Sequence, residues 1–153
     1  MKTLWKILGG IGLLLVIAFA GAIGKIVGKF TTGQFYEDQK EGALDTVLVN
    51  AASHINKKLP MMVDAETRLD SASVFKMGLR LNYTVVNYSA EEIDSSSFNN
   101  VKRKDLMNKL CNTDETKIFV ENKTSLSLSH AYYGKNGKQF SVITVQGSQC
   151  KSS

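Results

Sequence analysis

The sequence predicts an α+β domain in which helices cover one face of an antiparallel sheet, preceded by an N-terminal transmembrane helix. Three observations lead to this fold class. The spacing of apolar residues changes from helical to alternating at Pro60, two pairs of alternating segments are each joined by a turn that contains Gly, and a second helical segment separates the two pairs. The expected order after the membrane helix is helix, strand, strand, helix, strand, strand.

The first helix of the domain is expected over residues 34–59. Its apolar residues recur at spacings of three and four and form one stripe: Leu44, Leu48, Ala51, Ile55 and Leu59. Pro60 ends the helix, because proline lacks an N–H and disfavours a helical residue before it. Residues 31–43 contain Gly and several charges, so they are either a linker or the first turns of this helix.

Alternation of apolar and polar residues predicts two hairpins. The paired segments are 68–74 with 79–85, and 125–132 with 140–145. The first turn is expected at 75–78. The second turn contains Gly134 and Gly137, both of which can adopt a positive φ.

A second helix is expected between the hairpins, over residues 94–112. Asp94 and the serines that follow it supply side-chain oxygens for the N-cap. The inner face is expected to contain four apolar residues at imperfect spacing: Phe98, Val101, Leu106 and Leu110. Thr113 could cap a further short helix over residues 114–121.

The N-terminal segment is an uncharged run of 18 residues, 7–24, bracketed by Lys6 and Lys25. A helix needs about 20 apolar residues to span a bilayer. Because Lys25 can extend its amine toward the headgroups and the next two residues are apolar, residues 7–27 can cross a membrane. We favour an uncleaved anchor, with the chain passing once through the membrane and the domain on its exported side.

A cleaved signal peptide is the alternative for the same segment. Lys2 and Lys6 would form its basic region, residues 13–19 its apolar region, and Ala18-Phe19-Ala20 a cleavage site with small residues at both flanking positions. Cleavage there would leave an apolar new N-terminus at Gly21, which argues against it. Both alternatives export the rest of the chain.

The net charge of +5 is located almost entirely around the membrane segment. Residues 1–30 contain four lysines and no acid, whereas residues 31–153 contain the other 15 basic and all 14 acidic side chains. The domain at 44–150 therefore has no basic field that would favour nucleic acid as a partner. The predicted organisation is an anchor or signal segment at 1–30, a linker or helix start at 31–43, the domain, and a tail at 151–153.

The two cysteines, Cys111 and Cys150, are expected to form a disulfide. An exported domain with a single pair of cysteines favours a bridge, here one that would tie the end of the second helix to the end of the last strand. The catalytic alternative requires a free thiol beside a base. His130 is the single nearby candidate, and its place in an alternating strand favours packing instead.

No catalytic or metal-binding motif is present in the sequence, so we expect no enzymatic activity and no cofactor. The two histidines, His54 and His130, lie on separate elements without metalloprotease spacing. The carboxylates of Asp64, Glu66 and Asp70 lack the spacing of a calcium loop and are expected at a solvated face, paired with a neighbouring Arg.

Four residues are candidates for binding a partner. Tyr88 and Tyr133 lie on or beside strands, and tyrosine is common in interfaces because it combines an apolar ring with a polar end. Phe98 and Val101 lie where the apolar spacing of the second helix is imperfect, which suggests a cleft beside that helix. The expected occupant is a peptide or helix from another envelope protein.

Several short motifs, in this order, resemble one family. They are Leu59-Pro60 after a helix, the segment YTVVNYS at residues 83–89, Leu110-Cys111, the segment YYGKNG at residues 132–137, and Cys150 after the last strand. Together they are similar to the small α/β pilotins of type II secretion, over about residues 50–150. The resemblance implies a periplasmic domain with one disulfide that binds the C-terminal tail of an outer-membrane secretin.

One departure from that family affects the expected function. The pilotins are lipoproteins that are acylated on an N-terminal Cys, and this chain has no Cys near its N-terminus. The expected function is therefore a protein-binding module that is not an enzyme. We expect it to pass once through the bacterial inner membrane, to place its domain in the periplasm, and to be associated with an envelope secretion or assembly system. The alternative is a periplasmic or secreted inhibitor or accessory factor released by signal cleavage, and a small envelope hydrolase is a third class.

Overall fold

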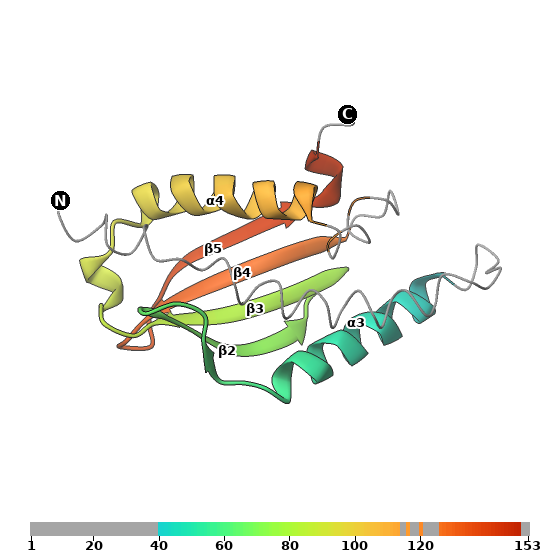
Figure 1. Ribbon diagram of the computed structural model, residues 1–153, viewed down its shortest axis with the longest axis horizontal. Coiled ribbons are helices and arrows are strands. Elements are labelled where there is room, and N and C mark those ends of the chain that lie inside the picture. Colours follow the sequence, from blue (N-terminus) through green and yellow to red (C-terminus); the bar gives the residue numbers. More distant parts are fainter. Residues whose placement is uncertain (1–39, 114–115, 117–119, 121–125, 151–153) are drawn as a thin grey trace.

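A computed structural model describes residues 40–113, 116, 120 and 126–150 (Figure 1). Two long helices and five strands make up this part of the chain. In chain order they are α3 (Lys40–Asn56), β1 (Met61–Met62), β2 (Thr67–Val74), β3 (Gly78–Val85), α4 (Ser95–Asn112), β4 (Ser127–Gly134) and β5 (Gln139–Gln146). The predicted α+β class is confirmed.

The strands form one sheet in the order β1-β2-β3-β4-β5. Both predicted hairpins, β2 with β3 and β4 with β5, are confirmed as antiparallel pairs. The expectation of a wholly antiparallel sheet is wrong, because β3 and β4 are parallel. Parallel neighbours need a connection of a dozen residues or more, and here that connection contains α4.

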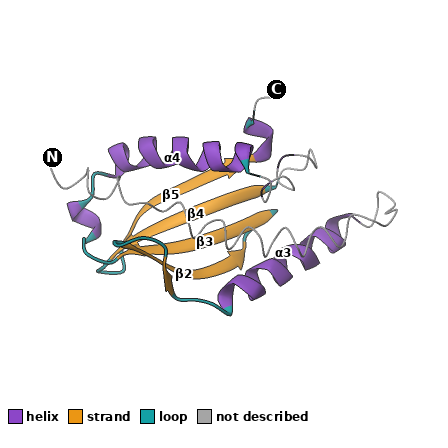
Figure 2. Ribbon diagram, viewed as in Figure 1, coloured by secondary structure: helices purple, strands orange, loops and turns teal. Residues whose placement is uncertain are grey.

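Both helices lie on one face of the sheet, as expected, with α3 along β2 and α4 along β5 (Figure 2). Register alignment places one buried residue of each long strand on this face, namely Leu69, Leu79, Tyr132 and Ile143. They form a single core with apolar residues of the two helices: Leu48, Ala51, Ala52, Ile55, Phe98 and Leu110. The opposite face has polar side chains at the intervening positions, among them Arg80 and Thr84.

The first helix follows its predicted stripe but ends earlier than expected. Leu48, Ala51 and Ile55 are buried against the sheet. The helix ends at Asn56 rather than at residue 59. The N–H groups of Lys58 and Leu59 donate to carbonyls three residues back, whereas an α-helix uses the carbonyl four residues back. Residues 34–39, and the side chain of Leu44, lie outside the described part of the chain.

The second helix begins and ends where the sequence predicts. The Asp94 carboxylate accepts hydrogen bonds from the N–H groups of Ser96 and Ser97, which would otherwise have no partner at the helix start. Three of its four predicted inner residues, Phe98, Leu106 and Leu110, contact the core, whereas Val101 is 44% exposed.

A β-bulge near the second turn changes which residues of β5 face inward. Tyr132 pairs with Ser141 and Tyr133 with Gln139, so Phe140 is an extra residue in the pairing. Phe140 therefore reaches the ring of Phe98, at a centroid distance of 5.1 Å, while the residues after the bulge alternate with Ile143 inward.

Two glycines allow close approaches at the ends of the parallel pair. A Cβ on Gly78 would lie 1.9 Å from the carbonyl oxygen of Ser127, and one on Gly134 would lie 2.3 Å from the backbone nitrogen of Ala90. The expectation of a positive φ holds for Gly137, at 73°, but Gly134 has no positive φ and is required for close packing.

The predicted disulfide between Cys111 and Cys150 is confirmed, with 5.5 Å between the Cα atoms. It joins the last turn of α4 to the segment that follows β5.

Two predicted segments lie outside the described residues: the membrane segment at 7–27 and most of the short helix at 114–121. Among the helices that the structure does describe, none combines the length and apolar character needed to cross a bilayer.

Two adjacent substitutions in α3 test the packing of the helix on the sheet. Leu48 is 4% exposed and Val49 is 54% exposed. Leu48→Asp should destabilise the fold by several kcal/mol, because it buries an unpaired charge, whereas Val49→Asp should change the free energy of unfolding by less than about 1 kcal/mol. Urea unfolding measures both, and equal stability of the two variants would contradict the described orientation of α3.

Removing the disulfide should destabilise the domain. The cysteines are separated by 39 positions, and closing a loop of that size in the unfolded chain accounts for about 4 kcal/mol. The double variant Cys111→Ala, Cys150→Ala should therefore unfold at lower urea concentration than the oxidised parent and match the reduced parent. A double variant as stable as the oxidised protein would contradict this.

Candidate functional site: the groove between α3 and β2

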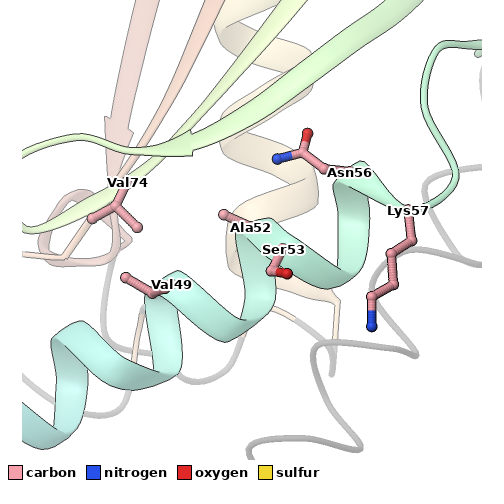
Figure 3. Close-up of a pocket in the computed structure, with 6 residues that line it drawn as sticks. All are labelled: Val49, Ala52, Ser53, Asn56, Lys57 and Val74. Atoms are coloured by element: carbon pink, nitrogen blue, oxygen red, sulfur yellow. The ribbon is translucent and has the colours of Figure 1, made fainter.

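A groove of about 620 Å³ lies between α3 and the end of β2 (Figure 3). We call it the α3–β2 groove. It is lined by one face of the second half of α3 and by the last residue of β2: Val49, Ala52, Ser53, Asn56, Lys57 and Val74. Figure 3 shows the side chains of Val49 and Ala52 directed from the helix toward the strand that contains Val74.

The groove exists because the neighbouring strand is very short. β1 pairs with β2 only at Leu69 and Arg68. Beyond this point, in the described part of the chain, no strand lies beside β2 on that edge. An edge strand exposes the N–H and C=O groups of alternate residues, which can pair with an incoming chain.

One side chain of α3 partly replaces the missing strand. The Asn56 amide nitrogen donates to the Ala72 carbonyl at 2.7 Å, and its oxygen accepts from the Ala72 N–H at 2.8 Å. The carboxamide thus forms the two hydrogen bonds that the N–H and C=O of one residue in a neighbouring antiparallel strand would form. It satisfies Ala72 and fixes the end of α3 to the sheet.

Val74 is the next residue whose main chain faces the same edge. At the hairpin turn, the Phe75 N–H donates to the Gly78 carbonyl of β3. In an antiparallel pair, successive residues direct their N–H and C=O groups alternately toward and away from the partner strand. The main-chain groups of Val74 and Ala72 therefore point away from β3, toward the outer edge of β2. Within the described residues, the Val74 N–H and C=O have no hydrogen-bond partner.

The groove also contains apolar surface and one positive charge. Val49 is largely exposed, and Val74 is half-buried beside it. The exposed Lys57 side chain forms no ion pair with any residue that the structure describes. Main-chain groups, an apolar surface and a cation together suit a peptide segment with an apolar side chain and a carboxylate.

The four residues predicted to bind a partner lie elsewhere and are not brought together. Phe98 lies on the buried face of α4, where its ring meets the ring of Tyr132 edge-on at a centroid distance of 4.9 Å. Val101 lies on the exposed side of α4, and Tyr133 on the opposite face of the sheet. Tyr88 lies after β3 and is partly buried against the core. A binding role for these residues stays a prediction.

Sequence reasoning missed the groove residues, although one signal was available. Val49 is an apolar residue outside the buried stripe of its helix, and a polar-faced helix gains nothing from an exposed valine there. The bonds from Asn56 to β2 join residues 16 positions apart, so no local pattern predicts them.

His130 is buried in the core and is not placed for catalysis. Its ring stacks on Tyr83 at a centroid distance of 5.7 Å, and neither ring nitrogen has a hydrogen-bond partner in the described structure. Burial, together with the positive charges of Lys109 and Lys102, lowers the pKa of His130 to about 3. The imidazole is therefore neutral near pH 7, and packing is its role, as the sequence suggests.

The other candidate groups for chemistry have structural partners. The Asp64 carboxylate accepts hydrogen bonds from the N–H groups of Glu66 and Thr67, which shapes the turn before β2. Asp70 forms the expected ion pair with Arg68. In the part of the chain that the structure covers, no three histidine, cysteine or acidic residues lie close enough to hold a metal ion.

Comparison with known proteins identifies related folds but no related sequence. No protein-family model and no curated protein matches the chain. A Pseudomonas aeruginosa protein proposed to be secreted has a similar structure, with a TM-score of 0.61 and 15% identity over 78% of this chain and 100% of its own.

Two pilotins of type II secretion systems from Vibrio have the same fold. EpsS from Vibrio vulnificus gives a TM-score of 0.58 at 12% identity, over 76% of this chain and 100% of its own. AspS from Vibrio cholerae gives 0.52 at 13% identity, over 74% and 97%. The resemblance predicted from sequence is confirmed at the level of the fold.

Acidification should destabilise the protein through His130. The unfolded chain binds a proton on this residue near pH 6.5, whereas the folded state does so only near its lowered pKa of about 3. Stability should therefore fall as the pH drops below about 6.5, by up to about 1.4 kcal/mol per unit. His130→Leu should show a shallower loss in urea unfolding between pH 6.5 and 4, and identical slopes for the two proteins would contradict this.

Proposed function

We propose that this protein is a non-enzymatic binding module of the bacterial cell envelope. Residues 7–27 hold it in the inner membrane, and the domain faces the periplasm. The uncharged N-terminal run supports the anchor. The disulfide supports an oxidising compartment, because cytosolic thiols are kept reduced.

The observation that carries the binding function is the α3–β2 groove. At one edge of the fold it combines the exposed apolar surface of Val49 with the main chain of Val74 and the cation of Lys57, both of which lack a partner among the described residues. These groups can bind a peptide segment.

The pilotin-like fold indicates the class of partner. EpsS and AspS are both components of type II secretion systems. We therefore propose that the partner is a segment of another envelope protein, in a secretion or assembly system. Since an uncleaved anchor keeps this chain at the inner membrane, its task differs from carrying a partner to the outer membrane.

Release by a signal peptidase is the second candidate, favoured by the Ala18-Phe19-Ala20 sequence. The product would be a periplasmic or secreted inhibitor or accessory factor. N-terminal sequencing of the protein purified from the producing bacterium distinguishes the two: a start at or near Met1 supports the anchor, and a start at Gly21 supports release.

Site-specific photocrosslinking of the full chain in intact cells tests the groove as a binding site. A photoreactive residue at Ser53, which is exposed in the groove, should give an adduct of discrete mass with an envelope protein. The same residue at Val101 or Tyr133 should give none, because these positions lie on other surfaces.

Val49→Asp provides the matched control for this experiment. It should abolish the Ser53 adduct without unfolding the domain, because it places a charge on the apolar part of the groove. Adducts from Val101 or Tyr133 alone would move the binding site to the surfaces predicted from sequence. An adduct at Ser53 that survives Val49→Asp would show contact without use of the groove and would contradict the proposal.

A further inference from the structure

We infer that the occupant of the α3–β2 groove is an extended segment of an envelope protein, which adds to the edge of β2 as a further strand and presents a carboxylate to Lys57. This inference rests on the proposed function and specifies its mode. The sheet, rather than a helical surface, would then provide the main-chain contacts.

The hydrogen-bonding capacity of the edge supports a strand. Val74 presents one N–H and one C=O that have no hydrogen-bond partner in the described part of the chain, beside a groove of about 620 Å³. An added strand pairs with both groups. A helix satisfies its own main chain internally, so a helix in the same groove would leave both Val74 groups without protein partners.

Asn56 shows that this edge accepts a strand-like partner. Its carboxamide already forms, at Ala72, the pair of bonds that a neighbouring strand would form. The side chain comes from the exposed end of α3, so rotation about its own bonds frees Ala72. The incoming strand then pairs with Ala72 as well as Val74, which lengthens the ladder toward β1.

The side chains around the edge define the chemistry of the segment. Alternate side chains of an added strand point to the same face, so one of them meets the apolar surface of Val49 and Ala52. Lys57 lies in the same groove without an ionic partner among the described residues, and Lys58 follows it. This local positive charge selects a segment with an acidic side chain or a C-terminal carboxylate.

Val74→Pro distinguishes strand addition from every other use of the groove. Proline retains an apolar side chain but removes the one N–H that the added strand needs. Because that N–H has no partner among the residues that the structure describes, the variant should fold, as proline is tolerated at the outward positions of edge strands. Val74→Thr keeps the N–H and similar volume, and is the matched control.

The measurements use the full chain in lipid nanodiscs and two synthetic probes. One probe is a strand-forming peptide of alternating valine and threonine that ends in glutamate, and the other is a helix-forming peptide of alanine and leucine with the same final residue. Fluorescence anisotropy reports binding, and hydrogen exchange reports protection of the Val74 amide. We expect the strand-forming peptide to bind, to slow Val74 exchange by at least about tenfold, and to bind Val74→Pro at least about tenfold more weakly.

Different outcomes separate this inference from the proposed function. If Val49→Asp abolishes the Ser53 adduct in cells while Val74→Pro leaves it unchanged, the groove is used without strand addition and the inference is overturned. If neither substitution affects that adduct, the proposed function itself fails. Three further results would each overturn the inference. The helix-forming peptide could bind in preference, the strand-forming peptide could leave the Val74 amide unprotected, or protection of Val74 could rise with protein concentration in the absence of peptide. The last result would identify a second copy of this chain as the occupant.

If Val74→Pro fails to fold, hydrogen exchange in the parent and in Val74→Thr still decides the question. Protection of residue 74 by the strand-forming peptide in both proteins supports strand addition. Unchanged exchange with bound peptide overturns it.

Discussion

The parallel pairing of β3 with β4 holds the two halves of this domain together. Each hairpin forms from residues close in sequence, but neither can bury its apolar face alone. The pairing aligns Gly78 with Ser127 at one end and Val85 with Gly134 at the other. Gly78 allows the closest of these approaches, since a side chain there would overlap the main chain of Ser127. Both helices then have a continuous sheet on which to pack.

The two helices complete the domain in different ways. The second helix is part of the connection between the parallel strands, is capped by Asp94 and is tied by its disulfide to the chain beyond β5. The first helix has no covalent tie to the sheet among the described residues, apart from the chain that leads into β1. It depends on its apolar stripe and on the two bonds of Asn56 to Ala72. The edge of β2 beside it is covered only in part, by two residues of β1 and by Asn56.

That incompleteness is the basis of the proposed function. An exposed strand edge favours aggregation, and proteins usually cover it with charge, a bulge or another element. Here β1 covers Arg68 and Leu69, and Asn56 covers Ala72. Within the described residues the Val74 main chain has no partner, and it lies next to an apolar surface and a lysine without an ion pair. A partner segment that pairs with this edge would gain binding energy from groups that have no partner among the described residues of the free protein.

The sequence by itself determined the local elements: the stripe of α3, the cap of α4 and the two hairpins. Their signals, periodicity and capping chemistry, lie in residues that are close together in the chain. It also determined the pairing of Cys111 with Cys150, because the chain contains a single pair of cysteines. It also predicted the pilotin-like fold. The tertiary structure alone decided the direction in which β3 meets β4, the extra residue at Phe140, and the bonds from Asn56 that shape the groove. These features join residues far apart in the chain, and their energy depends on a spatial arrangement that local patterns do not encode.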